Sequence, residues 1–522
     1  MSGTIFDFGS DNLTVDRINA LLQGRATGHL SKDVREKVTS SQRKVAEIAG
    51  RPASVYGINT GFGILANAKI SEADTRTLQF KILQSHSVGV GEPIPAEIAR
   101  IMLITKVHAL AQGFSGVQLG TLERILWHLT EDVIPVVPEK GSVGASGDLA
   151  PLSHLFLPLI GLGEVYCRGE RQPSRKVLAD YGLPALTLGP KEGLALINGT
   201  QFILAYAVKC VQRLHYCLEA ADIIGAMSLE ALTGTKAPFD ERLHRLRPFR
   251  GNQLVAQRLR LLLANSEIMR SHVDCGRVQD PYSLRCMPQV HGASRNAWQH
   301  LKQLTEIELN SVTDNPVVLE EGDVISGGNF HGQPLALPLD YACLAAAEIG
   351  NISDRRCYLL LEGKWGLPML LMNDVGLNSG FMIPQYTTAA LVTENKTHCF
   401  PASADSIPTS LGQEDHVSMG SISGRKLGMV LDNLEYILAI ELMSACQAIE
   451  FRRPLRSSAI LEAAHEFVRR SVSFAREDRI FAEDIRQLQS AIHDFSFVGY
   501  CDTVAAGLGM ALNAGFESEF SL

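Results

Sequence analysis

The sequence lacks a surplus of positive charge. Its 522 residues include 48 Lys and Arg against 56 Asp and Glu, which gives a formal net charge of −8. Proteins that bind nucleic acids or anionic membranes usually carry clustered positive charge, so this composition argues against both kinds of partner. With 46% apolar residues, the chain is long enough to bury a large core. We expect a globular protein that acts on a small molecule.

Several metal, nucleotide and redox motifs are also missing. The ten cysteines are scattered, with no CxxC pair and no Cys/His spacing typical of zinc sites, which predicts reduced thiols and no metal centre. No Walker loop, HExxH helix or GxGxxG turn occurs. Four histidines are too dispersed along the chain to form a predicted ligand set: His154, His291, His331 and His416.

Targeting segments are absent as well. The first residues, MSGTIFDFGSDNLT, show no basic region followed by an apolar one, as a signal peptide would. The long uncharged stretch 375–393 contains Asn378, Pro384 and Gln385, which a membrane span rarely tolerates together. We therefore expect a cytoplasmic protein without a membrane partner.

Strand-like alternation is sparse, and helical periodicity dominates. Five segments place apolar residues at steps of mostly three and four, which predicts long helices. These segments are 99–113, 200–232, 296–312, 339–363 and 424–451. Only two pieces have the pattern of short hairpins, 163–172 and 315–328. Long apolar helices need cover from other helices or another subunit, which favours a homo-oligomer; a large monomeric helical domain is the alternative.

Seven glycine- and asparagine-rich loops separate these helices. They are YGINTGFG (56–63), GSVGASGDLAP (141–151), LINGTQ (196–201), VQDPYSLRCMPQ (278–289), TDNPVV (313–318), SGGNFHGQP (326–334) and GQEDHVSMG (412–420). Taken singly, each is an ordinary turn. Because loops carry binding and catalytic residues more often than cores do, the seven together indicate a functional site.

The GASGD segment preceded by GSV, together with the other six loops, resembles the aromatic amino acid ammonia-lyases and aminomutases, and most of all their histidine-specific members. The resemblance extends from about Tyr56 to Glu450. It implies a mainly α fold, a long-helix bundle of the ammonia-lyase (fumarase/aspartase-like) type. On this basis we expect residues 1–200 to form a loop-rich N-terminal region and residues 201–522 the helix bundle. The resemblance also implies a homotetramer whose sites are built from three chains.

The same resemblance implies a prosthetic group made from the chain itself, without an external cofactor. Ala145, Ser146 and Gly147 would cyclise into 4-methylideneimidazole-5-one (MIO). The amide nitrogen of Gly147 must then attack the carbonyl of Ala145, a contact that ordinary backbone geometry forbids and that side chains would obstruct. Ser146 would lose water to form the methylidene, and we expect Asp148 to assist the dehydrations. The alternative is a simple turn in which Asp148 caps the following helix.

Removing ammonia from an amino acid requires an electrophile for the amine and a base for a weakly acidic β-proton. The resemblance assigns the base to Tyr56, in a loop that Gly57, Gly61 and Gly63 would make a mobile lid. It assigns the substrate carboxylate to Arg285, through a two-pronged hydrogen bond that lysine cannot reproduce. Four further residues would orient the reacting groups or supply an apolar wall: Tyr282, Gln279, Asn198 and Phe330.

Two positions bear on the choice of substrate. His86 resembles the histidine-specific members and can hydrogen-bond an imidazole or a phenol. Glu414 stands where tyrosine and phenylalanine members usually carry glutamine, and a carboxylate suits an imidazole. These residues lead us to expect elimination of ammonia from L-histidine to give trans-urocanate.

Two other interpretations stay open. Segment 368–374 departs from the pattern of the histidine-specific members, with Met369, Leu370 and Met372 at positions that brace or line the pocket. A tyrosine or phenylalanine ammonia-lyase, or a 2,3-aminomutase with the same electrophile, is therefore the first alternative. The second is a helical scaffold protein whose Ala-Ser-Gly triplet never cyclises.

Overall fold

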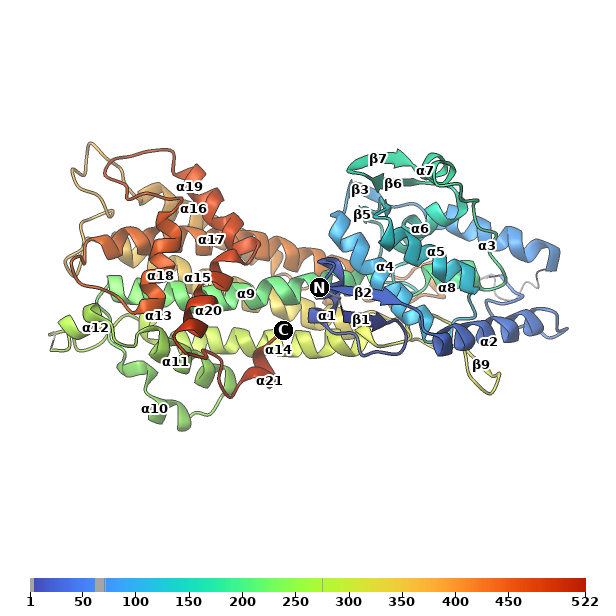
Figure 1. Cartoon of the computed structure of the whole chain (residues 1–522), viewed down its shortest axis with the longest axis horizontal. Helices are drawn as coiled ribbons and strands as arrows, with labels where there is room; N and C mark the ends of the chain where they lie inside the picture. Colours follow the sequence, from blue (N-terminus) through green and yellow to red (C-terminus); the bar gives the residue numbers. More distant parts are fainter. Residues whose placement is uncertain (1–3, 62–69, 71, 275) are drawn as a thin grey trace. The chain divides into compact units, whose positions relative to one another are not determined.

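The computed structural model describes residues 4–61, 70, 72–274 and 276–522. It is mainly α-helical, which confirms the expected fold class (Figure 1). The chain divides into two units, each made of stretches that are separate in sequence. Unit 1 comprises Met1–Lys209, Lys302–Leu339 and Pro401–Arg425, and unit 2 comprises Cys210–Leu301, Asp340–Phe400 and Lys426–Leu522.

Four long helices have residues in both units: α9 (Gln201–Ala231), α14 (Met287–Leu309), α15 (Gln333–Leu361) and α17 (Gly420–Glu450). With α4 (Ala96–Ala111), they confirm the five helices expected from periodicity. Helix α9 is rich in apolar residues, and almost all of its side chains are buried, including charged ones such as Glu219 and Asp222. Of the helices within the described residues, only α15 is long and apolar enough to cross a membrane, but 67% of its apolar window is buried, as in a core helix.

The remainder of unit 1 consists of short helices and short strands. The helices are α1 (Val15–Leu22), α2 (Lys32–Ala49), α3 (Glu72–His86), α5 (Leu119–Thr130), α6 (Leu149–Phe156), α7 (Ser174–Asp180) and α8 (Glu192–Ile197), with 3-10 turns at Leu157–Ile160, Ala402–Ala404 and Ser410–Gly412. The strands are β1 (Thr4–Asp7), β2 (Ala26–His29), β3 (Val90–Pro93), β4 (Ile134–Pro135), β5 (Pro138–Lys140), β6 (Glu164–Cys167), β7 (Glu170–Pro173), β8 (Val317–Val318) and β9 (Val324–Ile325). The antiparallel pairs β6–β7 and β8–β9 confirm the two expected hairpins. The parallel pair β1–β2 and the antiparallel pairs β3–β5 and β4–β6 leave no comparable pattern in the sequence.

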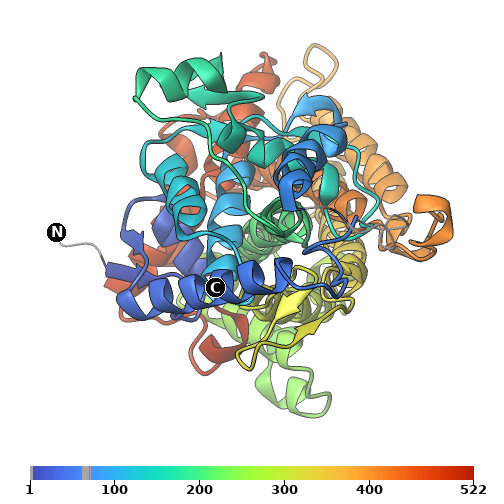
Figure 2. The same cartoon turned by 90° about the vertical axis from the view of Figure 1, so that its right-hand side faces the viewer.

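A small apolar cluster in unit 1 holds the loop that carries Tyr56. Val45 and Ile48 of α2 pack with Val318 of the β8–β9 hairpin and with Ile58, which lies two residues after Tyr56. Figure 2 shows the hairpin, in yellow, beside α2. Burial of Ile58 in this cluster fixes the start of the loop to the scaffold.

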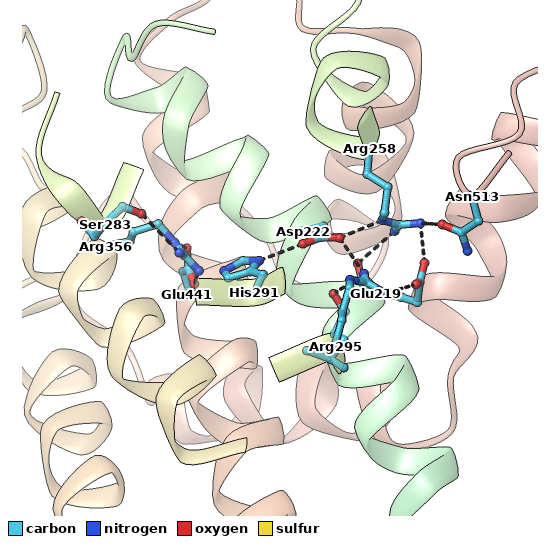
Figure 3. Close-up of polar contacts among 10 residues, drawn as sticks. Glu219, Asp222, Arg258, Ser283, His291, Arg295, Arg356, Glu441 and Asn513 are labelled. Carbon is cyan, nitrogen blue, oxygen red and sulfur yellow. Dashed lines mark hydrogen bonds and ion pairs between the residues drawn. The ribbon is translucent and has the colours of Figure 1, made fainter. Parts of the chain in front are cut away.

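Unit 2 is a helical bundle. Its own helices are α10 (Glu241–Arg245), α11 (Arg250–Leu262), α12 (Glu267–Ser271), α13 (Tyr282–Arg285), α16 (Met382–His398), α18 (Ala459–Arg469), α19 (Phe481–His493), α20 (Ser496–Gly507) and α21 (Glu517–Phe520), with a 3-10 turn at Ala237–Phe239. A buried ionic network joins α9, α11 and α14 (Figure 3). In it, Arg258 and Arg295 each contact both Glu219 and Asp222, at distances between 2.5 and 2.8 Å.

Candidate active site

The segment that contains Ala145, Ser146 and Gly147 lies against the residues that precede α9. Gly147 and Gly199 form a parallel β-bridge. The N–H of Asp148 donates to the Gly199 carbonyl at 2.8 Å, and the N–H of Gly199 donates to the Ser146 carbonyl at 3.4 Å. These main-chain bonds therefore hold the loops 141–151 and 196–201 against each other.

Glycine is required at position 147, where these two segments pair. A Cβ atom on Gly147 would lie 2.1 Å from the Gly199 carbonyl oxygen, and Gly147 has a φ of 80°. Ser146 has a φ of 50°, a left-handed conformation that costs free energy for a residue with a side chain. Close approach at Gly147 and local strain at Ser146 therefore occur in two of the three residues that the sequence singles out for cyclisation.

Asp148 lies next to these residues and is fully buried. Its carboxylate accepts hydrogen bonds from Ser142 Oγ at 3.0 Å and from the N–H groups of Phe202 and Ile203 at 3.1 and 3.0 Å. Although Asp148 precedes α6, its side chain makes no capping bond to that helix; it holds the first turn of α9 instead. Burial raises the pKa of Asp148 to about 7, despite these hydrogen bonds. The simple turn with a capping aspartate therefore does not describe this segment.

Glu414 reaches the same segment from the loop before α17. Ser146 Oγ donates to Glu414 Oε1 at 3.2 Å, while Thr409 and Ser410 donate their hydroxyls to Oε2 at 2.9 Å each. These bonds fix a half-buried carboxylate beside Ser146. Burial lowers the pKa of His86, and the negative charge of Glu414 acts in the opposite direction. The two side chains therefore interact electrostatically. The Nδ1 atom of His86 also lies 2.9 Å from Ser85 Oγ.

The other expected residues of unit 1 lie in two further loops of that unit. Tyr56 is half-buried at a turn, and Asn59 stabilises that turn by accepting from the N–H of Val55 at 2.8 Å. Gly63 lies outside the described residues. Phe330 is half-buried in the turn that precedes α15.

Asn198 offers an unused hydrogen-bond acceptor at this site. Its side chain is 3% exposed, and among the described residues no group donates to Oδ1. A buried acceptor without a donor is costly, which fits a position that receives a ligand N–H.

Three expected residues belong to unit 2 and form a cluster of their own. Arg285 donates from Nη2 to Gln279 Oε1 at 3.0 Å and from Nε to the Asp280 carbonyl at 3.0 Å. Its guanidinium lies over the ring of Tyr282, 4.6 Å from the centroid. Arg285 is thus held in one orientation by a side chain, a main-chain carbonyl and an aromatic face.

A buried ion pair supports this cluster from within unit 2 (Figure 3). Arg356 donates from Nη1 to the Ser283 carbonyl, in the middle of α13, at 3.4 Å. Its Nε and Nη2 atoms donate to Glu441 at 2.5 and 2.9 Å. Arg356 and Glu441 are both fully buried, so the turn between Tyr282 and Arg285 rests on a fixed charged pair.

The segment that departs from the family pattern also lies in unit 2. Met369 is 53% exposed, whereas Leu371 and Met372 are buried. Leu370 and Leu371 have left-handed φ values of 58° and 54°, and the N–H of Phe381 donates to the Leu370 carbonyl at 3.1 Å. The segment is a tight turn that the start of α16 stabilises.

Sequence reasoning missed several residues of this site. Gly199 pairs with Gly147, Thr409 and Ser410 hold Glu414, and Lys106 lies buried beneath Asn198. The one usable signal was Lys106, which is the only Lys, Arg, Asp or Glu in the apolar segment IMLITKVHALAQG (101–113). Within the described ranges, no group of three or more His, Cys, Asp and Glu side chains is arranged to hold a metal ion.

Known proteins share this fold and sequence over almost the whole chain. The sequence model of the aromatic amino acid lyase family matches residues 13–470. Histidine ammonia-lyase of Sorangium cellulosum is 50% identical over 87% of this chain and 90% of its own length. The crystal structure of histidine ammonia-lyase from Trypanosoma cruzi has a TM-score of 0.90 and 40% identity, and covers 99% of this chain and 98% of its own. The crystal structure of tyrosine aminomutase from Streptomyces globisporus has a TM-score of 0.91 and 34% identity, and covers 96% of this chain and 99% of its own.

Proposed function

The chain belongs to the aromatic amino acid lyase family, and from that membership we propose that it eliminates ammonia from L-histidine to give trans-urocanate. The names of its relatives support this substrate. The observation that carries the proposal is the hydrogen bond between Ser146 Oγ and Glu414 Oε1 at 3.2 Å. A carboxylate this close to Ser146 is within reach of an imidazole N–H, whereas the ring of phenylalanine offers it no donor.

We also propose that Ala145, Ser146 and Gly147 form 4-methylideneimidazole-5-one without an external cofactor. The residues present fit such a group, because Gly147 leaves no space for a side chain and Ser146 already has a left-handed φ of 50°. The buried acceptor of Asn198 fits a donor at the same place. When present, the group supplies an electrophilic carbon that captures the substrate amine.

The remaining steps belong to side chains of the chain itself. Arg285 would hold the substrate carboxylate, with Gln279 and Tyr282 fixing its guanidinium. Tyr56 would remove the β-proton, and His86 with Glu414 would bind the imidazole. Asn198 would orient the amine, and Phe330 would exclude water. Because members of the family assemble their sites from several subunits, we propose that the protein is a homotetramer. We also propose that it is cytoplasmic.

The test is to incubate the purified protein separately with L-histidine, L-tyrosine and L-phenylalanine. Ultraviolet spectra distinguish urocanate, coumarate and cinnamate, and we expect urocanate from L-histidine alone. A β-amino acid product would show that the protein is an aminomutase and not a lyase. The intact mass should be lower by two waters than the mass calculated from the amino-acid sequence. Inactive protein with the unmodified mass would reject both enzyme functions and would indicate a scaffold protein.

A further inference from the structure

Lys106 is a buried cationic residue that the proposed function does not use. It lies in α4 among apolar side chains and is 1% exposed. Its Nζ atom donates to the main-chain carbonyl of Asn198 at 2.6 Å and to Gln201 Oε1 at 3.5 Å. A fully buried amine loses its hydration, so its position requires compensating interactions.

Other charges near Lys106 are arranged differently. Lys191, also buried, pairs directly with Asp314 at 2.7 Å and donates to the Ser115 carbonyl at 3.0 Å. Burial lowers the pKa of Lys106 to about 7; Asp314 and Asp148 counteract this, and Lys191 adds to it. Within the described residues, Lys106 makes no hydrogen bond to a carboxylate. Its amine donates instead to the carbonyl of a main-chain peptide group and to a side-chain amide, and its pKa leaves it positively charged below a pH of about 7.

That peptide group connects Lys106 to Ser146. The carbonyl of Asn198 and the N–H of Gly199 belong to the same planar unit, and this N–H donates to the Ser146 carbonyl at 3.4 Å. A cation at one end of a peptide polarises it and strengthens the donor at the other end, especially in a low-dielectric interior. Lys106 therefore acts on the Ser146 carbonyl without touching it.

The chemistry of self-modification gives this carbonyl a role in the second dehydration. In ring closure, the nitrogen of Gly147 bonds to the carbonyl carbon of Ala145, and that oxygen leaves as water with the amide protons of Ser146 and Gly147. In the second step, Ser146 loses its Cα proton and its hydroxyl as another water, and a Cα–Cβ double bond forms. Removal of a proton next to a carbonyl places negative charge on the carbonyl oxygen, which a polarised N–H stabilises.

We propose that Lys106 is a positioning residue for the self-modification of this chain, acting through the Asn198–Gly199 peptide on the Ser146 carbonyl to promote the second dehydration. The inference rests on the proposed function, since it concerns the origin of the group that the function needs. It assigns Lys106 to maturation of the chain, separate from turnover of substrate.

The experiment follows intact mass during cell-free synthesis of the full chain. We expect wild type to lose two waters without a visible intermediate. Lys106→Met keeps the apolar stem and removes the charge, so it should accumulate a species that lacks one water and complete the second loss roughly 10-fold more slowly. Lys106→Arg restores a cation and should reduce the accumulation. The double variant Lys191→Met/Asp314→Asn removes a neighbouring buried pair but not Lys106, and should mature through both losses at the wild-type rate.

The outcomes separate the two proposals. An unmodified wild-type chain would overturn the proposed function, and this inference with it. A mature wild type together with a Lys106→Met chain that matures equally fast would overturn the inference alone. The inference would also be overturned if Lys106→Met folds, as shown by thermal unfolding, but loses no water at all. That result would mean that the substitution displaces the 141–151 loop and blocks the first dehydration as well. If Lys106→Met does not fold, Lys106→Gln supplies the uncharged variant and is judged by the same masses.

Discussion

Two carboxylates adjoin the 145–147 segment in different surroundings. Asp148 is fully buried, and burial raises its pKa to about 7. Glu414 is half-buried and accepts hydrogen bonds from Ser146, Thr409 and Ser410. A group with a pKa near neutrality exchanges protons readily. Glu414 keeps the hydroxyls of Thr409 and Ser410 after Ser146 has lost its own, so its carboxylate stays in place as an acceptor. Asp148 thus suits proton transfer during self-modification, and Glu414 suits recognition of the substrate.

Replacement of Glu414 tests this assignment. Glu414→Gln keeps the size of the side chain but removes its charge, so kcat/KM for L-histidine should fall roughly 10- to 100-fold, as expected for loss of a hydrogen bond to a charged group. Steady-state urocanate formation measures this, and the intact mass must still lack two waters. Asp415→Asn alters the neighbouring exposed carboxylate and should have little effect. Unchanged kcat/KM in mature Glu414→Gln would contradict the assignment.

Arg285 provides a second test at the level of one residue. Lysine keeps the charge but cannot make the two-pronged contact, so Arg285→Lys should raise KM for L-histidine roughly 10-fold, as expected for loss of a charge-assisted hydrogen bond. Initial rates over a range of substrate concentrations separate KM from kcat. Arg270→Lys, at an exposed arginine of unit 2, is the control. Equal KM values for both variants would argue against carboxylate binding by Arg285.

At the level of elements, the segment before α9 and the Ala-Ser-Gly segment fit each other through two glycines. Gly199 has a φ of 124°, and a Cβ atom there would lie 2.6 Å from Gln201 Oε1 and 2.9 Å from Thr313 Oγ1. Asp148 ties the two segments together by binding the first turn of α9. The geometry needed for ring closure thus depends on where α9 begins.

Gly199→Ala should therefore impair maturation. The added methyl group would clash with Gln201 and Thr313 at a φ that disfavours a side chain, and would shift the segment that pairs with Gly147. A large fraction of the purified chain should therefore keep its unmodified mass and lack activity. Gly120→Ala is the matched control, since nothing lies within 4 Å of a Cβ there and Gly120 is helical in α5. Full maturation of Gly199→Ala would show that the close approach is dispensable.

Helix α5 carries an acid-sensitive residue. Burial lowers the pKa of His128 to about 4, and its Nδ1 atom bonds to the Val133 carbonyl at 2.8 Å. Because the folded-state pKa lies below the unfolded value near 6.5, this contribution to stability is complete above pH 6.5 and is lost as the pH falls. The loss should reach about 2 kcal/mol at pH 5.

Urea unfolding at pH 7 and pH 5 measures this loss. His128→Asn keeps a donor but does not titrate, so the difference between the two free energies of unfolding should shrink by about 2 kcal/mol. His300→Asn, at an exposed histidine, should leave the difference unchanged. An equal pH dependence in all three proteins would exclude His128 as the sensitive group.

The sequence pattern predicts some of these elements and not others, for physical reasons. Helix α9 is predictable because its apolar period is local, and the same holds for the β6–β7 hairpin. The bond between Ser146 and Glu414 joins residues 268 positions apart, so only the resemblance of their two loops to one family links them. Lys106 illustrates the limit of periodicity, since a charged residue in a helix ordinarily marks an exposed face, and here the fold buries it.

On the scale of the whole molecule, a network of buried charges links three helices of the bundle in unit 2. Arg258 and Arg295 satisfy Glu219 and Asp222, and His291 bonds Asp222 at 2.8 Å. These arginines hold the pKa of the Asp222 carboxyl well below its usual range, although burial opposes them. Such a network contributes little net stability when complete, but removal of one partner leaves an uncompensated charge in the interior.

Arg295→Met should therefore lower the free energy of unfolding by about 3–5 kcal/mol. Arg245→Met removes the exposed pair with Glu241 and should cost less than about 1 kcal/mol. Denaturant unfolding of both variants makes the comparison. A small effect of Arg295→Met would mean that Arg258 alone neutralises the two carboxylates.

The bonds that join residues 146–148 to Gly199 use only the Ser146 and Gly199 carbonyls and the Asp148 and Gly199 N–H groups. Loss of two waters leaves all four atoms in place, although Ser146 gives up its bond to Glu414, so newly made and processed copies should share the same overall fold. Size-exclusion chromatography would then not separate one form from the other. A preparation that is homogeneous in size can therefore still contain inactive, unmodified molecules. Specific activity should be divided by the fraction of molecules that have lost two waters.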